Sequence, residues 1–221
     1  MRSEFDRVVA EIGKVIVGKR PVIERLLTAL LANGHVLMDD VPGTGKTTLA
    51  IALSRSLGLA FVRVQFTPDV LPSDLTGFSV YDKEHGDFVY RPGALSRANL
   101  LLGDEINRAS SKTQSALLEA MEERRVTIDG KSYPLQSPFL VIATQNSVDA
   151  EGTWPLPFAQ MDRFAVRLSL GYPDHDAQMS LLKERQGSDP LDHMQRVLSS
   201  EELLDLQKEV RSVTASDAIL D

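Results

Sequence analysis

The sequence contains no cysteine among its 221 residues, which excludes disulfide bonds and thiolate metal sites. Aromatic residues make up only 6% of the chain, and no apolar run is long enough to cross a membrane as a helix. The start, MRSEFDRVVAEIGKV, is charged and amphipathic and lacks the apolar region of a signal peptide. These absences favour a cytoplasmic protein without a membrane span.

Charge and hydrophobic content narrow the choice of partners. The formal net charge of −7 gives no general attraction to nucleic acid or to an anionic membrane. We therefore expect protein partners and no nucleic acid. The 43% of hydrophobic residues suits one or two globular domains with a real core.

The most informative stretch is VPGTGKTT at residues 41–48, between an apolar run and a helix-periodic run. A strand, a glycine-rich turn and a helix follow one another here. This order directs the unpaired N–H groups and the positive end of the helix dipole at one point, and it predicts a phosphate-binding loop. Lys46 can reach the β- and γ-phosphates, and the Thr47 hydroxyl can ligate Mg²⁺. The general signature has glycine where this chain has Asp40. We expect that carboxylate to point away from phosphate or to pair with a cation.

Two carboxylates follow the buried strand predicted at 100–102, within NLLLGDEINR. Open α/β sheets place their chemistry at the C-terminal ends of strands. Asp104 has the place and type to hold Mg²⁺ through water, and Glu105 to orient or deprotonate the attacking water. Any strand can end in acids, but this pair becomes specific alongside the phosphate loop.

Two further polar residues lie at predicted element ends. Asn146 follows the strand predicted at 139–144, where it would donate a hydrogen bond to the γ-phosphate or the water; the alternative is that it caps the next turn. Arg163 follows a short helix, as an arginine that serves a neighbour's nucleotide would. Its alternative role is a surface ion pair with Asp162 or Glu151.

The remaining patterns complete a sheet with two insertions. FSVY and DFVY face each other across DKEHG and predict a hairpin, for which the alternative role is to cover a sheet edge. RVTIDGKSYPL predicts a second hairpin that turns at Asp129-Gly130. Further strands are predicted at 35–38, 61–66 and 165–170. The predicted helix N-caps are Ser3, Ser110 or Ser111, Asp174, Ser199 or Ser200, and Ser216.

The combination of VPGTGKTT, LLLGDEINRASSKTQSALLEAMEERRVTIDG, ATQNSVDAEGTWPLPFAQMDRF and GYPD resembles the MoxR-type AAA+ ATPases across nearly the whole chain. The resemblance implies an α/β P-loop NTPase fold with five parallel strands flanked by helices, two inserted β-hairpins and a small helical lid. It divides the chain into a core at residues 1–171 and an incomplete lid at 172–221. The lid of the family carries a second sensor arginine that this chain lacks, so we expect the chain to be cut within the lid.

The resemblance also implies roles for single residues. Asp104 and Glu105 match the Walker B pair, Asn146 matches the first sensor, and Arg163 matches the arginine finger. The segment thought to contact adenine contributes Val17 and Gly18. The predicted contacts in the phosphate loop are Pro42, Gly43, Thr44, Gly45, Lys46, Thr47 and Thr48.

The sequence thus predicts a Mg²⁺-dependent ATP hydrolase of the MoxR type. The resemblance implies hexameric rings and a chaperone-like role, remodelling partners that bear von Willebrand factor type A domains or assisting their cofactor loading. One alternative is an AAA+ motor on nucleic acid, which needs basic hairpins, whereas DKEHGD is acidic and the second hairpin offers only Arg125 and Lys131. Another alternative is a nucleotide-dependent switch with little turnover, which needs neither Glu105 nor Asn146.

Overall fold

The computed structural model of the chain describes residues 2–146, 153–173, 175–184 and 189–214. At its centre is a parallel five-stranded sheet in the order β2-β5-β8-β1-β9. The five predicted strands are confirmed to within two residues at their ends. The strands are β1 (Val36–Asp39), β2 (Phe61–Gln65), β5 (Leu100–Asp104), β8 (Leu140–Gln145) and β9 (Val166–Leu168).

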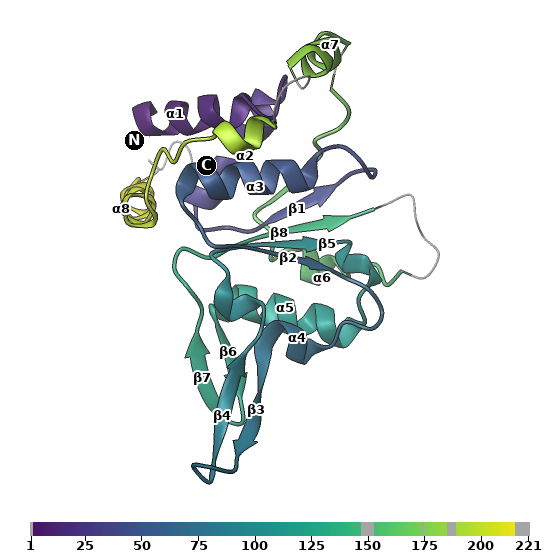
Figure 1. The fold of residues 1–221 in the computed structure, drawn as a ribbon, viewed down its shortest axis with the longest axis vertical. Coiled ribbons are helices and arrows are strands. Elements are labelled where there is room, and N and C mark those ends of the chain that lie inside the picture. The colour runs from purple at the N-terminus through teal and green to yellow at the C-terminus, as the bar shows by residue number, and fades with distance from the viewer. Residues whose placement is uncertain (1, 147–152, 174, 185–188, 215–221) are drawn as a thin grey trace.

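Helices cover both faces of this sheet (Figure 1). One face carries α1 (Arg2–Gly13), α2 (Arg20–Leu31) and α3 (Lys46–Leu57), and the other carries α4 (Pro72–Thr76), α5 (Ser111–Glu123) and α6 (Phe158–Met161). After β9 come α7 (His175–Glu184) and α8 (Ser200–Arg211). Three short 3-10 helices, η1 (Leu95–Arg97), η2 (Ile106–Arg108) and η3 (Pro190–His193), lie between these elements. Within the described ranges, no helix has the length and apolar character needed to span a membrane.

The alternation of side chains along the central strands builds two apolar layers. In β5, Leu100 and Leu102 join the cluster formed with α1, α2 and α3, whereas Leu101 joins the cluster formed with α5. All three side chains are fully buried. Strands that are covered on both faces have unbroken apolar runs, and this pattern is the reason that the sequence predicted a buried strand at 100–102.

Both predicted hairpins are present, each as a separate two-stranded sheet. The first pairs β3 (Gly77–Asp82) with β4 (Asp87–Pro92), and the second pairs β6 (Arg125–Ile128) with β7 (Lys131–Pro134). They project from the α5 side, away from the main sheet, so the first hairpin does not cover a sheet edge (Figure 1). The turn of the second hairpin has positive φ at Asp129 and Gly130, as predicted.

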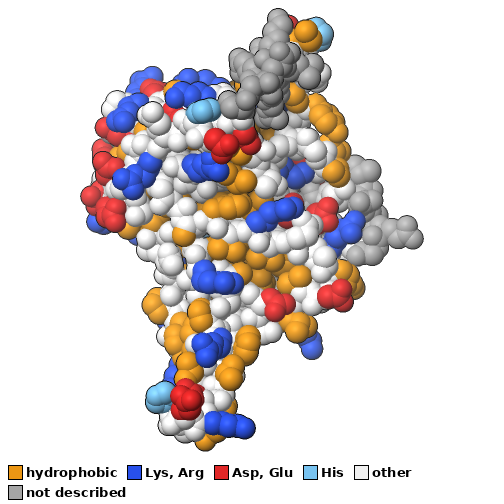
Figure 2. Space-filling model, viewed as in Figure 1, with side chains coloured by type: hydrophobic (Ala, Val, Ile, Leu, Met, Phe, Trp, Pro, Cys, Tyr) orange, Lys and Arg blue, Asp and Glu red, His pale blue; other side chains and the backbone are white. Residues whose placement is uncertain are grey.

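The projecting hairpins carry exposed hydrophobic side chains and contact each other at their bases. Figure 2 shows these side chains gathered along the protrusion. Tyr90 of β4 stacks on Tyr133 of β7, with ring centroids 4.0 Å apart. The Tyr90 hydroxyl also donates a 2.6 Å hydrogen bond to the carbonyl of Thr76. The exposed members of the first hairpin are Phe78, Val80, Tyr81, Phe88 and Val89.

Two of the predicted helix caps are present. Ser110 caps α5, where its hydroxyl accepts a hydrogen bond from the N–H of Thr113. Ser199 caps α8 in a capping box, in which the Glu202 carboxylate accepts the Ser199 N–H at 2.7 Å. Each cap satisfies N–H groups that the first helical turn leaves without an intrahelical partner.

The predicted cap at the first helix is wrong. Helix α1 already includes Arg2, so Ser3 has helical backbone geometry and lies inside the first turn, where its hydroxyl donates to Glu4. A cap residue needs the extended geometry that Ser3 does not have. The predicted caps Asp174 and Ser216 lie outside the described residues.

Helix α8, near the end of the described residues, packs beside the helices at the start of the chain. Gln207 of α8 donates a 2.7 Å hydrogen bond to the carbonyl of Leu30 in α2. Just before α8, the N–H of Gln195 donates to the Glu11 carboxylate of α1 at 2.8 Å. Leu203 buries its side chain in the cluster on the α3 face of the sheet.

Candidate functional site

A cavity of about 440 Å³ opens at the C-terminal edge of the sheet. It lies between the loop that precedes α3 and the ends of β2, β5 and β8, where open α/β sheets bind ligands. The predicted residues that line it are Pro42, Gly43, Thr44, Gly45, Lys46, Thr47, Thr48, Asp104, Glu105 and Asn146. The fold thus brings together residues separated by about a hundred positions in the sequence.

The loop before α3 has the geometry of an anion site. Gly43 and Gly45 have φ of 81° and 93°, a region that residues with a Cβ rarely adopt. A Cβ on Gly43 would meet nothing within 4 Å, so the space beside the loop is open. Gly45 is the N-cap of α3, which leaves the first N–H groups of that helix available to a ligand.

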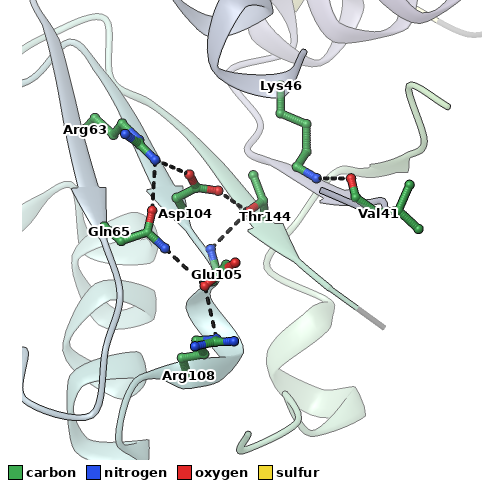
Figure 3. A network of polar contacts seen from close by, with 8 residues as sticks. All are labelled: Val41, Lys46, Arg63, Gln65, Asp104, Glu105, Arg108 and Thr144. Carbon is green, nitrogen blue, oxygen red and sulfur yellow. Dashed lines mark hydrogen bonds and ion pairs between the residues drawn. The ribbon is translucent and has the colours of Figure 1, made fainter. Parts of the chain in front are cut away.

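Lys46 supplies the positive charge of this loop. Its Nζ donates to the carbonyl oxygen of Val41 at 2.9 Å (Figure 3) and to that of Asp40 at 3.1 Å. These contacts hold the ammonium group over the loop backbone. An anion bound in the loop would meet this ammonium group together with the α3 N-terminus.

Asp40 is the residue that departs from the general signature. Hydrogen-bond donors, rather than a cation, stabilise its negative charge. Its carboxylate accepts the Ser169 hydroxyl at 3.1 Å and the N–H of Gly171 at 3.1 Å. It also accepts the N–H of Leu170. The donors come from the segment that follows β9, so Asp40 ties the start of the loop to that segment.

Asp104 ends β5 and has a hydrogen-bond donor on each carboxylate oxygen. The Thr144 hydroxyl donates to Oδ1 and an Arg63 N–H donates to Oδ2, both at 2.7 Å (Figure 3). Thr144 in turn accepts the N–H of Glu105 at 2.9 Å. Because a carboxylate oxygen accepts more than one hydrogen bond, Asp104 keeps capacity for a metal-bound water.

Glu105 lies at a backbone position that few residues with side chains adopt. Its φ and ψ of 57° and 51° are left-handed, a conformation that costs free energy and is concentrated at functional sites. The side chain is fixed by Gln65, whose Nε2 donates to Oε2 at 3.1 Å, and by an ion pair with Arg108 at 3.0 Å. The carboxylate is therefore held in one place on the wall of the cavity.

Asn146 lines the cavity directly after β8, as predicted. Its backbone carbonyl accepts a 3.5 Å hydrogen bond from the side-chain amide of Asn107. The turn that Asn146 would cap in the alternative interpretation begins at residue 147, outside the described residues.

Arg163 lies apart from the residues that line the cavity in the described chain. It follows α6 and forms an ion pair with Glu122 of α5, with 2.6 Å between Nη2 and Oε2. Arg163 thus forms a surface ion pair, but its partner is Glu122 and not the predicted Asp162. The other predicted partner, Glu151, lies outside the described residues.

A second cavity of about 250 Å³ lies on the other side of the loop. It is lined mainly by apolar residues of the 15–19 segment and of the segment after β9, and Val17 is among them. Gly18 is not among them; its φ is 73°, and a Cβ there would approach the Cβ of Ala177 to 3.1 Å. The two cavities share Gly43, Thr44, Gly45 and Thr48.

The two cavities together fit a nucleoside triphosphate. A ligand whose phosphates bind the loop has an apolar cavity on one side for a planar base, and two carboxylates on the other side for a metal ion. The amide and ammonium donors of the loop suit phosphate oxygens.

Three contributors to the site were absent from the sequence prediction. Arg63, Arg108 and Thr144 hold the two carboxylates, together with Gln65 at the end of the strand predicted at 61–66. One signal was available for Arg63 and Gln65, because alternation along FVRVQF places both polar side chains on one face of β2.

The comparisons with known proteins agree with this geometry. The family described as "ATPase family associated with various cellular activities (AAA)" matches residues 35–166, more than half of the chain. Protein YeaC of Bacillus subtilis is 51% identical over 213 residues, which cover 96% of this chain and 66% of that protein. Chaperone MoxR1 of Mycobacterium tuberculosis is 42% identical over 217 residues, which cover 98% of this chain and 57% of that protein. The chain belongs to the MoxR-type AAA+ ATPases.

A solved structure confirms the fold expected of a MoxR-type protein. A "putative ATPase" from Cytophaga hutchinsonii matches with a TM-score of 0.86 and 41% sequence identity, over 99% of this chain and 66% of that chain. The predicted AAA+ core with its five-stranded parallel sheet is therefore confirmed. This MoxR-type chain spans 57% to 66% of the length of these three relatives.

Proposed function

We propose that this chain binds ATP with Mg²⁺ and hydrolyses it to ADP and phosphate. The observation that carries the proposal is the meeting, in one cavity, of the phosphate loop with Asp104 and Glu105 of the adjoining sheet edge. Thr144 joins the two carboxylates by hydrogen bonds to the Asp104 side chain and the Glu105 backbone. A site that only bound nucleotide would not need the second carboxylate.

Each residue of the site has a distinct proposed role. The N–H groups at the start of α3 and the Lys46 ammonium bind phosphate oxygens. Thr47 and Asp104 hold Mg²⁺, which when bound neutralises charge on those oxygens. Glu105 orients the attacking water and accepts its proton, and the Asn146 amide donates a hydrogen bond to the γ-phosphate or that water.

The remaining predicted residues complete the nucleotide site. Val17 and Gly18 bind the adenine side, supported for Val17 by its place in the second cavity. Arg163 acts on the nucleotide of a neighbouring subunit in a homo-oligomer, which for this family we propose to be a hexamer. Its position apart from the cavity of its own chain supports a role in trans.

We further propose a chaperone-like role, supported by the relative named chaperone MoxR1. Hydrolysis would remodel partner proteins or assist their cofactor loading, and a protein with a von Willebrand factor type A domain is the proposed partner. The exposed apolar side chains of the first hairpin favour a protein partner over nucleic acid. The division into a core at 1–171 and a lid at 172–221, and the cytoplasmic location, stay predictions.

An assay of phosphate release, with and without single-stranded DNA, tests the proposal. We expect Mg²⁺-dependent release from ATP that DNA does not stimulate, and no release by Lys46→Ala, because that variant loses the main side-chain counter-ion of the phosphates. Stimulation by DNA would favour the nucleic-acid motor. ATP binding without release would favour the switch, and absence of ATP binding would overturn the assignment of the loop.

A further inference from the structure

Arg63 is a second cation in the wall of the cavity, contributed by the strand at the edge of the sheet. It lies on β2 in register with Leu102 of β5, on the face that carries α3. Leu102 at this level is fully buried, whereas the Arg63 side chain is 47% exposed and lines the cavity. Because β2 is an edge strand, this position is open enough for a charged side chain that reaches the cavity.

The guanidinium of Arg63 uses only one of its three nitrogens in hydrogen bonds to the described side chains around it. Its Nη2 donates to Asp104 Oδ2 at 2.7 Å and to Gln65 Oε1 at 2.9 Å. In the described part of the chain, the N–H groups on Nε and Nη1 have no acceptor. The group is therefore oriented by two neighbours and retains donors for a ligand.

The balance of charges around the cavity indicates what Arg63 contributes to it. Among the described residues, the cavity is lined by the acidic Asp104 and Glu105 and by the cationic Lys46 and Arg63, while the Asp40 carboxylate is bound by the segment after β9. Lys46 lies on the loop, and Figure 3 shows Arg63 on the other side of Asp104 and Thr144. Mg²⁺ bound by Thr47 and Asp104 would neutralise part of the repulsion between phosphate oxygens and the two strand-end carboxylates, and Arg63 adds a second positive charge beside Asp104.

We propose that Arg63 binds the terminal phosphate of ATP within its own subunit, opposite Lys46. The inference rests on the proposed function. In this arrangement the α- and β-phosphates of ATP bind the N–H groups at the α3 N-terminus. The γ-phosphate then reaches the carboxylate side of the cavity, where Arg63 lies. Arginine suits this task because its planar group can bind Asp104 and a phosphate oxygen at the same time. Arg63 would thereby favour ATP over ADP.

Calorimetric binding of a non-hydrolysable ATP analogue and of ADP, both at saturating Mg²⁺, tests this proposal. We expect Arg63→Ala to weaken analogue binding about 10-fold or more, as loss of a charge-assisted hydrogen bond does, while ADP binding changes little. Arg63→Lys, which keeps the charge but loses the fork, should weaken analogue binding by less. Arg125→Ala is the matched control, because Arg125 is an exposed arginine on β6 that pairs with Glu123 and is not among the described residues that line the cavity.

The ADP measurement also shows whether each variant is folded. An equal loss for analogue and ADP, or no loss for either, would overturn the inference. A higher Mg²⁺ requirement without loss of ATP preference would also overturn it, because Arg63 would then only orient Asp104. If the parent chain binds neither nucleotide, the proposed function itself fails, and this outcome is distinct from the others.

Discussion

The side-chain amide of Gln65 donates a 3.1 Å hydrogen bond to Oε2 of Glu105. The same oxygen forms an ion pair with Nε of Arg108 at 3.0 Å. Two donors, from β2 and η2, therefore hold one oxygen of the carboxylate that we propose as the proton acceptor. This arrangement limits the side chain to one orientation while leaving the other oxygen, Oε1, for water.

The first prediction is that Glu105→Gln retains nucleotide binding but loses hydrolysis. The amide keeps the size of the side chain, yet it cannot accept a proton, and general bases contribute about 10² to 10⁴ in rate. We expect phosphate release to fall by about that factor and the Kd for ATP by calorimetry to change little. Glu123→Gln, on an exposed residue of α5, serves as the control. Turnover equal to that of the parent would show that Glu105 is not the base.

The second prediction is that Arg163→Ala binds ATP normally but hardly hydrolyses it. An arginine finger contributes about 10³ or more in rate. The ion pair with Glu122 does not conflict with a role in trans, because the Glu122 side chain is 57% exposed and such surface pairs contribute at most about 1 kcal/mol. Contact with a neighbouring subunit can therefore replace this pair at little cost in free energy.

Mixed rings separate a role in trans from a role in cis. Arg163→Ala subunits and Glu105→Gln subunits are each expected to be inactive alone. When they are mixed equally, roughly a quarter of sites combine an intact Glu105 with an intact Arg163 from the neighbour. Activity should then reappear in rings that exchange subunits. Exchange without recovery of activity would place the action of Arg163 within its own subunit.

The third prediction concerns the stability that Asp40 provides. Asp40→Gly restores the general loop signature but removes the acceptor for Ser169, Leu170 and Gly171. Leu170 is buried, so its N–H would remain without a partner at a cost of about 1 to 3 kcal/mol. We expect a lower midpoint of thermal unfolding by circular dichroism, with a smaller decrease for Ser169→Ala. An unchanged midpoint would mean that water replaces the carboxylate without cost.

The fourth prediction is a loss of stability in acid that originates at His35. Its Nδ1 accepts the Val141 N–H at 3.0 Å and its Nε2 donates to the Met121 carbonyl at 3.1 Å, which fixes the neutral ring. Burial, followed by the charge of Arg124, lowers the pKa of His35 to about 3. The unfolded chain, in which a histidine has a pKa near 6.5, therefore binds an additional proton below that pH.

The sign of the effect follows from this difference in pKa. The contribution of the neutral His35 to the free energy of unfolding should be complete above about pH 6.5. As the pH falls from there toward 3, this contribution should decrease by about 1.4 kcal/mol per pH unit. Urea unfolding between pH 7 and 4 measures this slope. His35→Gln should reduce the slope, whereas His175→Gln, on an exposed residue of α7, should not. The same slope in all three proteins would assign the acid effect to other groups.

The sequence was sufficient for the five strands of the main sheet, the two hairpins and the phosphate loop, but not for the start of α1 or for the short helices α4, η1, η2 and η3. Apolar runs bounded by turns located the strands, and the motif VPGTGKTT located the loop, because both signals are local. The roles of Arg63 and Thr144 depend on β2 and β8 lying on either side of β5, an order that no local pattern determines. The partner of Arg163 could not be predicted either, because Glu122 lies 41 positions away and becomes a neighbour only when α6 packs near α5.

The stacking of Tyr90 on Tyr133 has a mechanical consequence. The two hairpins come from insertions into different crossovers, the first preceding β5 and the second preceding β8. Because the rings link the hairpins at their bases, we expect a movement of either hairpin to act on both β5 and β8. Glu105 and Asn146 directly follow these strands, so movement of the hairpins would reach both residues at the strand-end side of the cavity.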